Sequence, residues 1–250
     1  MATLQSLDRG LRALSLVSLA PEGLTVAEIA TRLGTDRATA YRIVDTLEQH
    51  ALVTRGVGKR VRLGAGAVVF AGRFQPQLVR AAGPVLQELA DAAGVAAFLS
   101  LAQGDDACVP VLSAEPARQT IFQVSYRIGA GHPLDKGANG IAILALQPAA
   151  EGDSAAVRQA REAGYSVTAG ELQQGAVGVA AGFEVPHLLG ASVGTVAMGE
   201  VDVDRLGELV REAAARLARL GRACSTLRTD GSGVNELALS GSGRTAYTSR

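Results

Sequence analysis

The sequence predicts an α+β protein with two parts, an N-terminal winged helix-turn-helix and a C-terminal, mainly antiparallel sheet flanked by helices. The first observation is that residues 6–49 hold three segments with helical spacing, followed by a basic hairpin signal that ends at residue 63. The second observation is that strand-like runs dominate from residue 95 onward, with helical segments between them. This order is typical of a sheet covered by helices.

Three helices are expected before the hairpin, at residues 6–19, 25–33 and 36–49. Thr25 and Glu28 have the spacing of a capping box, and Thr35 is expected to cap the third helix after the turn at Gly34. The inward positions are Leu7, Leu11, Leu14 and Val17 in the first helix, Val26, Ile29, Ala30 and Leu33 in the second, and Ala40, Ile43, Val44 and Leu47 in the third.

The hairpin is predicted from two strand-like pieces, 52–55 and 60–63, joined by Gly56-Val57-Gly58-Lys59. Residues 1–64 carry nine Lys and Arg against six Asp and Glu, so their net charge is +3 and the rest of the chain carries −3. A locally basic module suits DNA binding, although on charge alone a solvated charged turn explains the hairpin equally well.

The order of capped helix, glycine turn, capped helix and basic hairpin is that of a winged helix-turn-helix, whose second helix enters the major groove. Arg can bond guanine edges, Thr and Ala can contact a thymine methyl, and helix N-termini can bind phosphate. The bland alternative is three helices of an unrelated bundle with a charged loop. The expected DNA contacts are Thr25, Thr35, Arg37, Ala38, Thr39, Tyr41 and Arg42 from the helices and Arg55, Lys59, Arg60 and Arg62 from the wing.

The rest of the chain is expected to begin with a connecting helix near 65–74 and a longer helix at 77–93, in which Pro84 marks a kink or a late start. Strands are expected at 95–102, 107–113, 120–126, 164–168, 177–182 and 191–198, and further helices near 139–146, 154–163 and 204–221. The expected domains are 1–64 for DNA binding, 65–76 as a linker helix, 77–224 as the sheet domain and 225–250 as a disordered Gly/Ser-rich tail.

Composition limits the remaining function classes. Hydrophobic residues make up 48% of the 250 residues, which is enough for packed cores. Two cysteines give no disulfide framework, and neither a signal-like N-terminus nor an apolar run of about 18 residues is present, so a cytoplasmic protein outside the membrane is expected. The three histidines lack ligand spacing, and no nucleophile elbow, P-loop or dinucleotide fingerprint occurs. We therefore expect no metal, no cofactor and no enzymatic activity.

The chain resembles the IclR family of bacterial regulators. The resemblance is carried by SLDRGLRALSLVSLAPEGLTVAEIATRLGTDRATAYRIVDTLEQHALV, the wing ending in RLG, RAAGPVLQELADAAG, RIGAGHPL, REAGYSV and GAVGVAAGF, which together span about residues 5–220. It implies a winged helix for DNA, a linking helix and a GAF-like effector domain. It also implies dimers or tetramers that bind palindromic operator DNA.

The resemblance further implies a pocket for a small organic effector, such as a carboxylate, on the C-terminal sheet. Carried over by position, the pocket residues are Ile121, Val124, Ala138, Asn139, Thr168, Gly178, Thr195 and Ala197. The sequence departs from the family at several of them: residues 135–141 read DKGANGI, Thr168 stands where an acid is common, and Gly178 stands where a cysteine is common.

Three functions are therefore open. The first is a sequence-specific DNA-binding transcriptional regulator whose operator affinity is modulated by an effector bound in the C-terminal domain. The second is a DNA-binding regulator whose C-terminal domain only oligomerises and binds no effector. The third, an enzymatic second domain, lacks a base and nucleophile constellation in the sequence.

Overall fold

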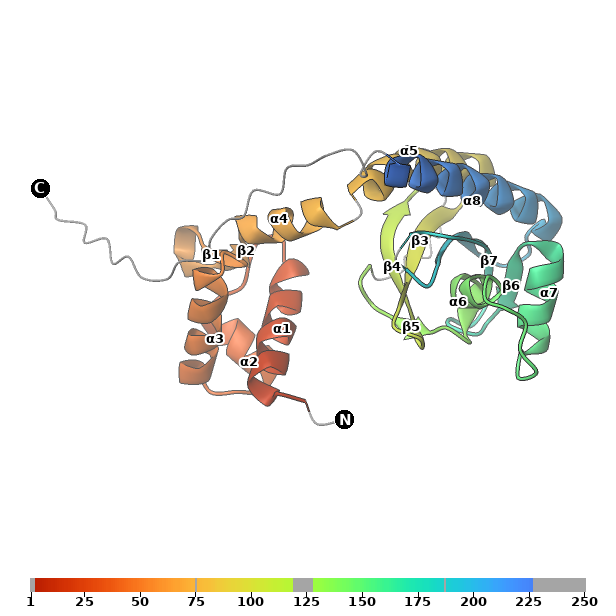
Figure 1. Ribbon diagram of the computed structural model, residues 1–250. Helices are drawn as coiled ribbons and strands as arrows, with labels where there is room; N and C mark the ends of the chain where they lie inside the picture. The colour runs from red at the N-terminus through yellow and green to blue at the C-terminus, as the bar shows by residue number, and fades with distance from the viewer. Residues whose placement is uncertain (1–2, 75, 119–127, 187, 227–250) are drawn as a thin grey trace, which may run out of the picture. The chain divides into compact units, whose positions relative to one another are not determined.

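The computed structural model describes residues 3–74, 76–118, 128–186 and 188–226. The chain divides into two compact units, Met1–Val79 and Arg80–Arg250 (Figure 1). The predicted strand at 120–126, the effector residues Ile121 and Val124, and the predicted tail from residue 227 onward lie outside the described residues. Within them, no helix combines the length and the apolar character that crossing a membrane requires.

The first unit has three helices, a small hairpin and a fourth helix after the hairpin (Figure 1). Its elements are α1 (Gln5–Ser18), α2 (Val26–Leu33), α3 (Arg37–Gln49), β1 (Val53–Arg55), the 3-10 turn η1 (Val57–Lys59), β2 (Val61–Leu63) and α4 (Ala65–Arg73). β1 and β2 pair antiparallel, as the hairpin signal predicts, with Thr54 opposite Arg62. The winged helix-turn-helix arrangement is thereby confirmed.

One apolar core holds this unit together. All four predicted inward residues of α2 are buried, as are Ala40, Val44 and Leu47 of α3, and Ile43 packs partly buried against the same cluster. The prediction for α1 is wrong at two positions, since Leu7 and Leu11 are 57% and 53% exposed. Val17 is buried and Leu14 packs against the core, as predicted, and Ala13 joins them. Helical spacing shows that a helix has an apolar side but not how far its neighbours cover that side.

The helix ends differ from the prediction at one residue. The capping box of Thr25 and Glu28 is present, as predicted. Thr35 does not cap α3: its backbone N–H donates to the carbonyl of Ala30 at 3.0 Å, in the Schellman arrangement that follows the left-handed Gly34. Asp36 is the N-cap residue of α3, because its carboxylate accepts the N–H of Thr39 at 2.9 Å.

The second unit is built on a six-stranded sheet of order β5-β4-β3-β8-β7-β6, in which every neighbouring pair is antiparallel. The strands are β3 (Ala96–Gln103), β4 (Ala107–Ala114), β5 (His132–Pro133), β6 (Ser166–Ala169), β7 (Ala176–Phe183) and β8 (Ala191–Met198). Apart from the undescribed 120–126 segment, each predicted strand is found within about two residues, and only the two-residue β5 is unpredicted.

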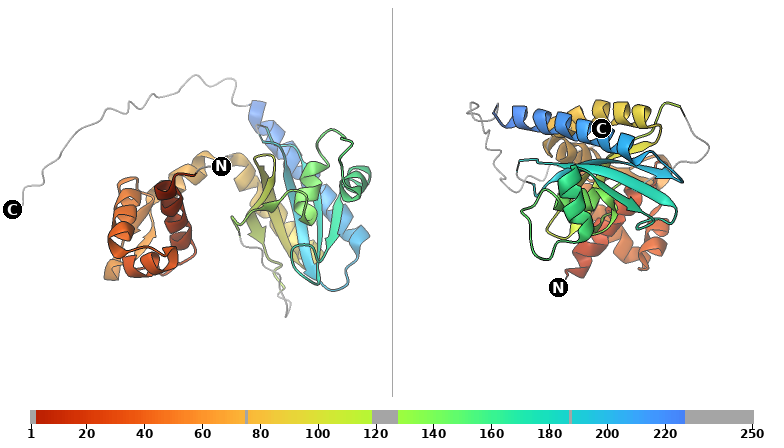
Figure 2. Two further views of the ribbon diagram at one scale, coloured as in Figure 1. Left: turned by 90° about the horizontal axis from the view of Figure 1, so that it is seen from below. Right: turned by 90° about the vertical axis from the view of Figure 1, so that its right-hand side faces the viewer.

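Helices cover both faces of the sheet (Figure 2). They are α5 (Pro76–Ala93) and α8 (Val203–Thr226) on one face and α6 (Gly137–Leu144) and α7 (Ala155–Ala163) on the other. Pro84 lies inside α5, so it does not mark a late start of that helix. Because side chains alternate between the faces of a strand, one face of β7 and β8 packs against α8 and the other against α6. This layered α+β arrangement is the predicted fold class.

Candidate nucleic-acid interface and sensor face

The first turns of α3 present the side chains expected in a DNA groove. Arg37, Ala38, Tyr41 and Arg42 are exposed, with Tyr41 at 51%, whereas Ala40 between them is fully buried. Thr39 is half-buried. The predicted base-reading residues of this helix therefore lie together on its solvent side, and the apolar side of the same helix faces the core.

A chain of hydrogen bonds orders this surface. The Asp36 carboxylate accepts both the N–H of Thr39, at 2.9 Å, and its hydroxyl, at 2.8 Å. The guanidinium of Arg42 donates to the same hydroxyl at 3.2 Å. These bonds to Thr39 lower the pKa of Asp36 below its ordinary value. Thr39 and Arg42 are thus partly oriented before any ligand is bound.

The helix N-termini offer fewer free amides than the sequence suggests. The N–H of Thr25 donates to Glu28 at 2.7 Å, and the N–H of Thr35 donates to Ala30. Both residues keep their places beside the start of a helix, but neither has a backbone amide to spare. In the first turn of α3, the amides of Thr39 and Ala38 both face the carboxylate of Asp36 and lower its pKa.

The wing carries one base that differs from the other three. Lys59 is exposed at the end of η1 with a backbone φ of 58°, next to Gly58 at 72°. Across residues 3–74, Lys59, Arg37 and Arg42 make no ion pair. These three side chains are therefore available to a polyanion.

The three wing arginines are already paired with acids of the same unit. Arg60 lies 3.4 Å from Glu28, and Arg62 lies 3.6 Å from Glu22. Arg55 pairs with both Asp45 and Glu48 of α3. Counting charges within 51–64 missed these pairs, because all the partner acids lie before residue 51 in the chain.

In the second unit, three predicted effector residues come together beneath α6. Thr168 of β6 stands opposite Gly178 of β7. A Cβ placed on Gly178 would lie 3.2 Å from the Cβ of Ala138 and 3.3 Å from the hydroxyl of Thr168. Ala138, Thr168 and Gly178 therefore share one small patch of the face that α6 covers.

Thr195 and Ala197 do not join this patch. Their neighbour Gly194 faces α6, since a Cβ placed on it would lie 2.4 Å from the side-chain oxygen of Asn139. Alternation along β8 then turns Thr195 and Ala197 toward the opposite face, whereas Val196, the partner of Gly178, faces α6. A shift of one residue along this strand moves its side chains to the other face of the sheet, so a carry-over by position that is moved by one residue would place Gly194 and Val196 toward α6.

Polar groups at the start of α6 are bonded within the protein. The amide of Asn139 donates to the hydroxyl of Ser100 at 2.7 Å, and the N–H of Gly137 donates to the carboxylate of Glu171 at 2.8 Å. Glu171 thus occupies the helix N-terminus where an anion was expected. It was missed because it lies 34 residues further along the chain. Beside Asn139 lies a small cavity of about 10 Å³. It is bounded by Phe98, Ser100, Pro110, His132 and Asn139.

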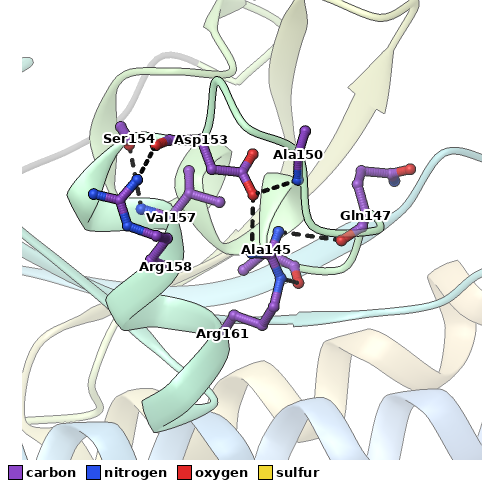
Figure 3. Close-up of polar contacts among 8 residues, drawn as sticks. All are labelled: Ala145, Gln147, Ala150, Asp153, Ser154, Val157, Arg158 and Arg161. Carbon is purple, nitrogen blue, oxygen red and sulfur yellow. Dashed lines mark hydrogen bonds and ion pairs between the residues drawn. The ribbon is translucent and has the colours of Figure 1, made fainter.

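The other end of α6 is held by Arg161 of α7 (Figure 3). Its guanidinium donates to the carbonyls of Ala145 and Gln147 at 3.3 and 3.2 Å and pairs with Asp153 at 2.9 Å. A cation beside these carbonyls is favourable at a helix C-terminus. Bonds from the amide of Ala150 and from Arg161 lower the pKa of Asp153. The helix that covers this face of the sheet is therefore bonded at both ends.

Comparison with known proteins agrees with this arrangement. Residues 6–56 match the IclR helix-turn-helix domain. The HTH-type transcriptional regulator Rv1719 of Mycobacterium tuberculosis is 33% identical over 146 residues, which cover 58% of this chain and 55% of that protein, so the match spans about half of the relative.

Solved structures extend the likeness to both units. An IclR transcriptional regulator from Alicyclobacillus acidocaldarius is 25% identical, with a TM-score of 0.68 over 88% of this chain and 100% of that one. An IclR homologue from Microbacterium hydrocarbonoxydans, crystallised with 4-hydroxybenzoate, is 21% identical, with a TM-score of 0.69 and the same coverage, and shares the fold. Residues 6–56 therefore form an IclR helix-turn-helix domain, and the chain is similar in fold to IclR regulators over most of its length.

Proposed function

We propose that this protein is a transcriptional regulator that binds duplex DNA with α3 in the major groove and Lys59 of the wing on the backbone. The observation that carries the proposal is the exposed start of α3, where Arg37 and Arg42 are free of ion pairs among residues 3–74 and where Thr39 and Arg42 are pre-ordered by Asp36. Arg on a groove-facing helix reads base edges, whereas Lys on a wing contacts phosphate without sequence preference.

The test uses the full chain and a duplex that the chain itself enriches from a random library. Arg42→Ala should weaken binding to this duplex more than to random DNA, with roughly 1–3 kcal/mol of discrimination lost. Arg37→Ala should also weaken binding to the enriched duplex. Lys59→Ala should weaken binding to both duplexes equally. It should also flatten the slope of the logarithm of the association constant against the logarithm of salt concentration by about 0.9. Arg12→Ala, which removes the same charge from α1, is the matched control.

Two results would contradict the groove assignment. One is an equal loss for enriched and random DNA in Arg42→Ala, because that is the behaviour of a phosphate contact. The other is the absence of any duplex binding by the unmodified chain at low ionic strength, which would remove the proposed function altogether.

We also infer that the protein self-associates. The first unit leaves apolar side chains uncovered on two helices, with Leu7 and Leu11 of α1 at 57% and 53% exposure and Val68 and Phe70 of α4 at 73% and 63%. Exposed apolar side chains that gather in one patch mark interaction surfaces, and we infer that these four take part in one. A twofold assembly would also present two recognition helices to a palindromic operator.

Sedimentation of two charged variants tests this inference. Leu11→Lys and Phe70→Lys should shift the protein toward the monomer, whereas Val57→Lys, at a hairpin position that is 91% exposed, should not. A monomeric wild-type chain at micromolar concentration would overturn the inference.

For the second unit we propose a sensor role, in which a small organic effector binds under α6 and alters DNA affinity. Support comes from the patch formed by Ala138, Thr168 and Gly178 and from the neighbouring cavity. The cavity has room for about one water molecule, so an organic effector requires α6 or its flanking loops to move. An anionic effector would also compete with Glu171 for the amide of Gly137.

Thermal shift measurements with 4-hydroxybenzoate and 4-hydroxybenzamide test this role. A true effector at about 100 times its Kd stabilises the folded state by about 2.7 kcal/mol. Glu171→Gln should increase the effect of the acid more than that of the amide, because it removes the competing charge. If a wider set of small acids and amides neither stabilises the protein nor changes its DNA affinity, the second unit serves oligomerisation alone.

A further inference from the structure

The wing is attached to the recognition helix by three charged side chains, which we call the α3–wing clamp: Asp45 and Glu48 of α3 and Arg55 at the end of β1. One oxygen of Glu48 accepts the backbone N–H of Arg55 at 3.0 Å, and the other pairs with its guanidinium. The second nitrogen of the same guanidinium pairs with Asp45. Arg55 thus makes three contacts with one helix, all within the first unit.

The acids of the clamp stand where a helix alone would not favour them. Glu48 is one residue before the end of α3 at Gln49, and Asp45 lies one turn earlier. Negative side chains near a helix C-terminus are unfavourable because the dipole is negative there. Their pairing with Arg55 offsets this effect, and the hydrogen bond with Asp45 raises the pKa of Arg55. The arginine is therefore committed to the helix and has lost much of its freedom to reach a phosphate.

The clamp acts at the end of β1 that leads into the turn of the wing. The base of β1 is anchored by the N–H of Leu52, which donates to Leu47 at 2.9 Å, and β2 is anchored by the bridge between Leu24 and Val61. Arg55 is the last residue of β1, and the turn that carries Lys59 begins two residues later. Its pairing with α3 sets the direction in which this turn leaves the helix.

We propose that Asp45, Glu48 and Arg55 are positioning residues that hold Lys59 at a set place relative to the recognition helix, and that Arg55 is not itself a DNA contact. This inference rests on the proposed function of the first unit. It reassigns Arg55, which its charge alone would place on the DNA backbone.

The sign of the effect separates positioning from simple electrostatics. Removing an acid near a DNA-binding surface reduces repulsion, so electrostatics alone predicts tighter binding. If the clamp positions the wing, Glu48→Ala instead weakens binding to the enriched duplex and flattens the salt slope by about 0.9, because the phosphate contact of Lys59 is lost. Glu22→Ala is the matched control, since Glu22 also pairs with a wing arginine but its side chain is 89% exposed and contacts only that guanidinium.

The experiment measures the affinity of the full chain for the enriched duplex over a salt series, with thermal unfolding recorded for each variant. The expected result is weaker binding and a flatter slope for Glu48→Ala, unchanged or tighter binding for Glu22→Ala, and no further loss when Lys59→Ala is added to Glu48→Ala. If Glu48→Ala does not fold, Glu48→Gln is read by the same criteria.

Two outcomes count against the proposals, and they differ. If Glu48→Ala binds the duplex as tightly as Glu22→Ala and its salt slope is unchanged, the positioning role of the clamp is overturned while DNA binding stands. Failure of the unmodified chain to bind any duplex overturns the proposed function itself.

Discussion

Replacing Ile29 by alanine tests whether the first unit has a core of its own. Ile29 is 0% exposed at the centre of a cluster that also contains Val17, Val44 and Val61. Truncating a fully buried isoleucine costs about 2–5 kcal/mol, because the removed methyl groups lose their contacts and leave a cavity. A unit of 79 residues has a free energy of unfolding of about 4–12 kcal/mol, so the loss is a large share.

For a unit of this size, each kcal/mol lowers the melting temperature by about 4–8 °C, so Ile29→Ala should lower one unfolding transition by at least about 8 °C. Circular dichroism of the full chain gives the transition, and hydrogen exchange assigns it to α2 and α3. Val57→Ala, at a position 91% exposed, should change stability by less than about 0.5 kcal/mol. Val193→Ala, buried in β8, should move the transition of the second unit instead.

If Ile29→Ala reduces exchange protection equally in α2 and in β3 or β8, the first unit has no separate core. The same conclusion follows if its melting temperature falls no further than that of Val57→Ala. At temperatures between the unfolding transitions of the two units, the Ile29→Ala protein should lose DNA binding while the second unit stays folded.

Three further predictions follow from local contacts. The pKa of Asp36 is lowered by its bonds to Thr39, so its contribution to stability is present at neutral pH and lost below about pH 4; melting curves of Asp36→Asn should show less acid sensitivity. Burial raises the pKa of Cys108 to about 12, so in a Cys224→Ser background a thiol reagent at pH 8 should react only after unfolding. Gly64→Ala should destabilise the start of α4, since its Cβ would meet the carbonyl of Ala51 at 2.2 Å, whereas Gly72→Ala, which meets nothing within 4 Å, should raise the melting temperature.

Local patterns in the sequence predict most of the fold. The apolar spacing of α2 and α3 identifies their buried faces, and the capping box at Thr25 identifies where α2 begins. Thr35 was misplaced as a cap because Thr and Asp are both good N-cap residues, and only the folded backbone shows that α3 begins at Arg37, directly after Asp36.

The misses in the candidate sites have a common physical origin. The pairing of Arg55 with Asp45 and Glu48, and of Gly137 with Glu171, joins residues that only the folded chain brings together. Side-chain alternation makes Thr195 face the wrong way after a shift of a single residue. The periodicity of apolar residues therefore predicts neither the contacts between distant segments nor the register of a single strand.

The glycines beneath α6 set the distance between this helix and the sheet. At Gly182 and Gly194, an added methyl group would meet the carbonyl of Ala142 at 2.3 Å and the side chain of Asn139 at 2.4 Å. How deeply the helix sits on the sheet is therefore decided by positions that carry no chemistry of their own. Divergence at these two positions would change the space between α6 and the sheet while every polar group remained in place, so if the proposed effector binds there, its size could be altered without replacing any polar side chain of the site.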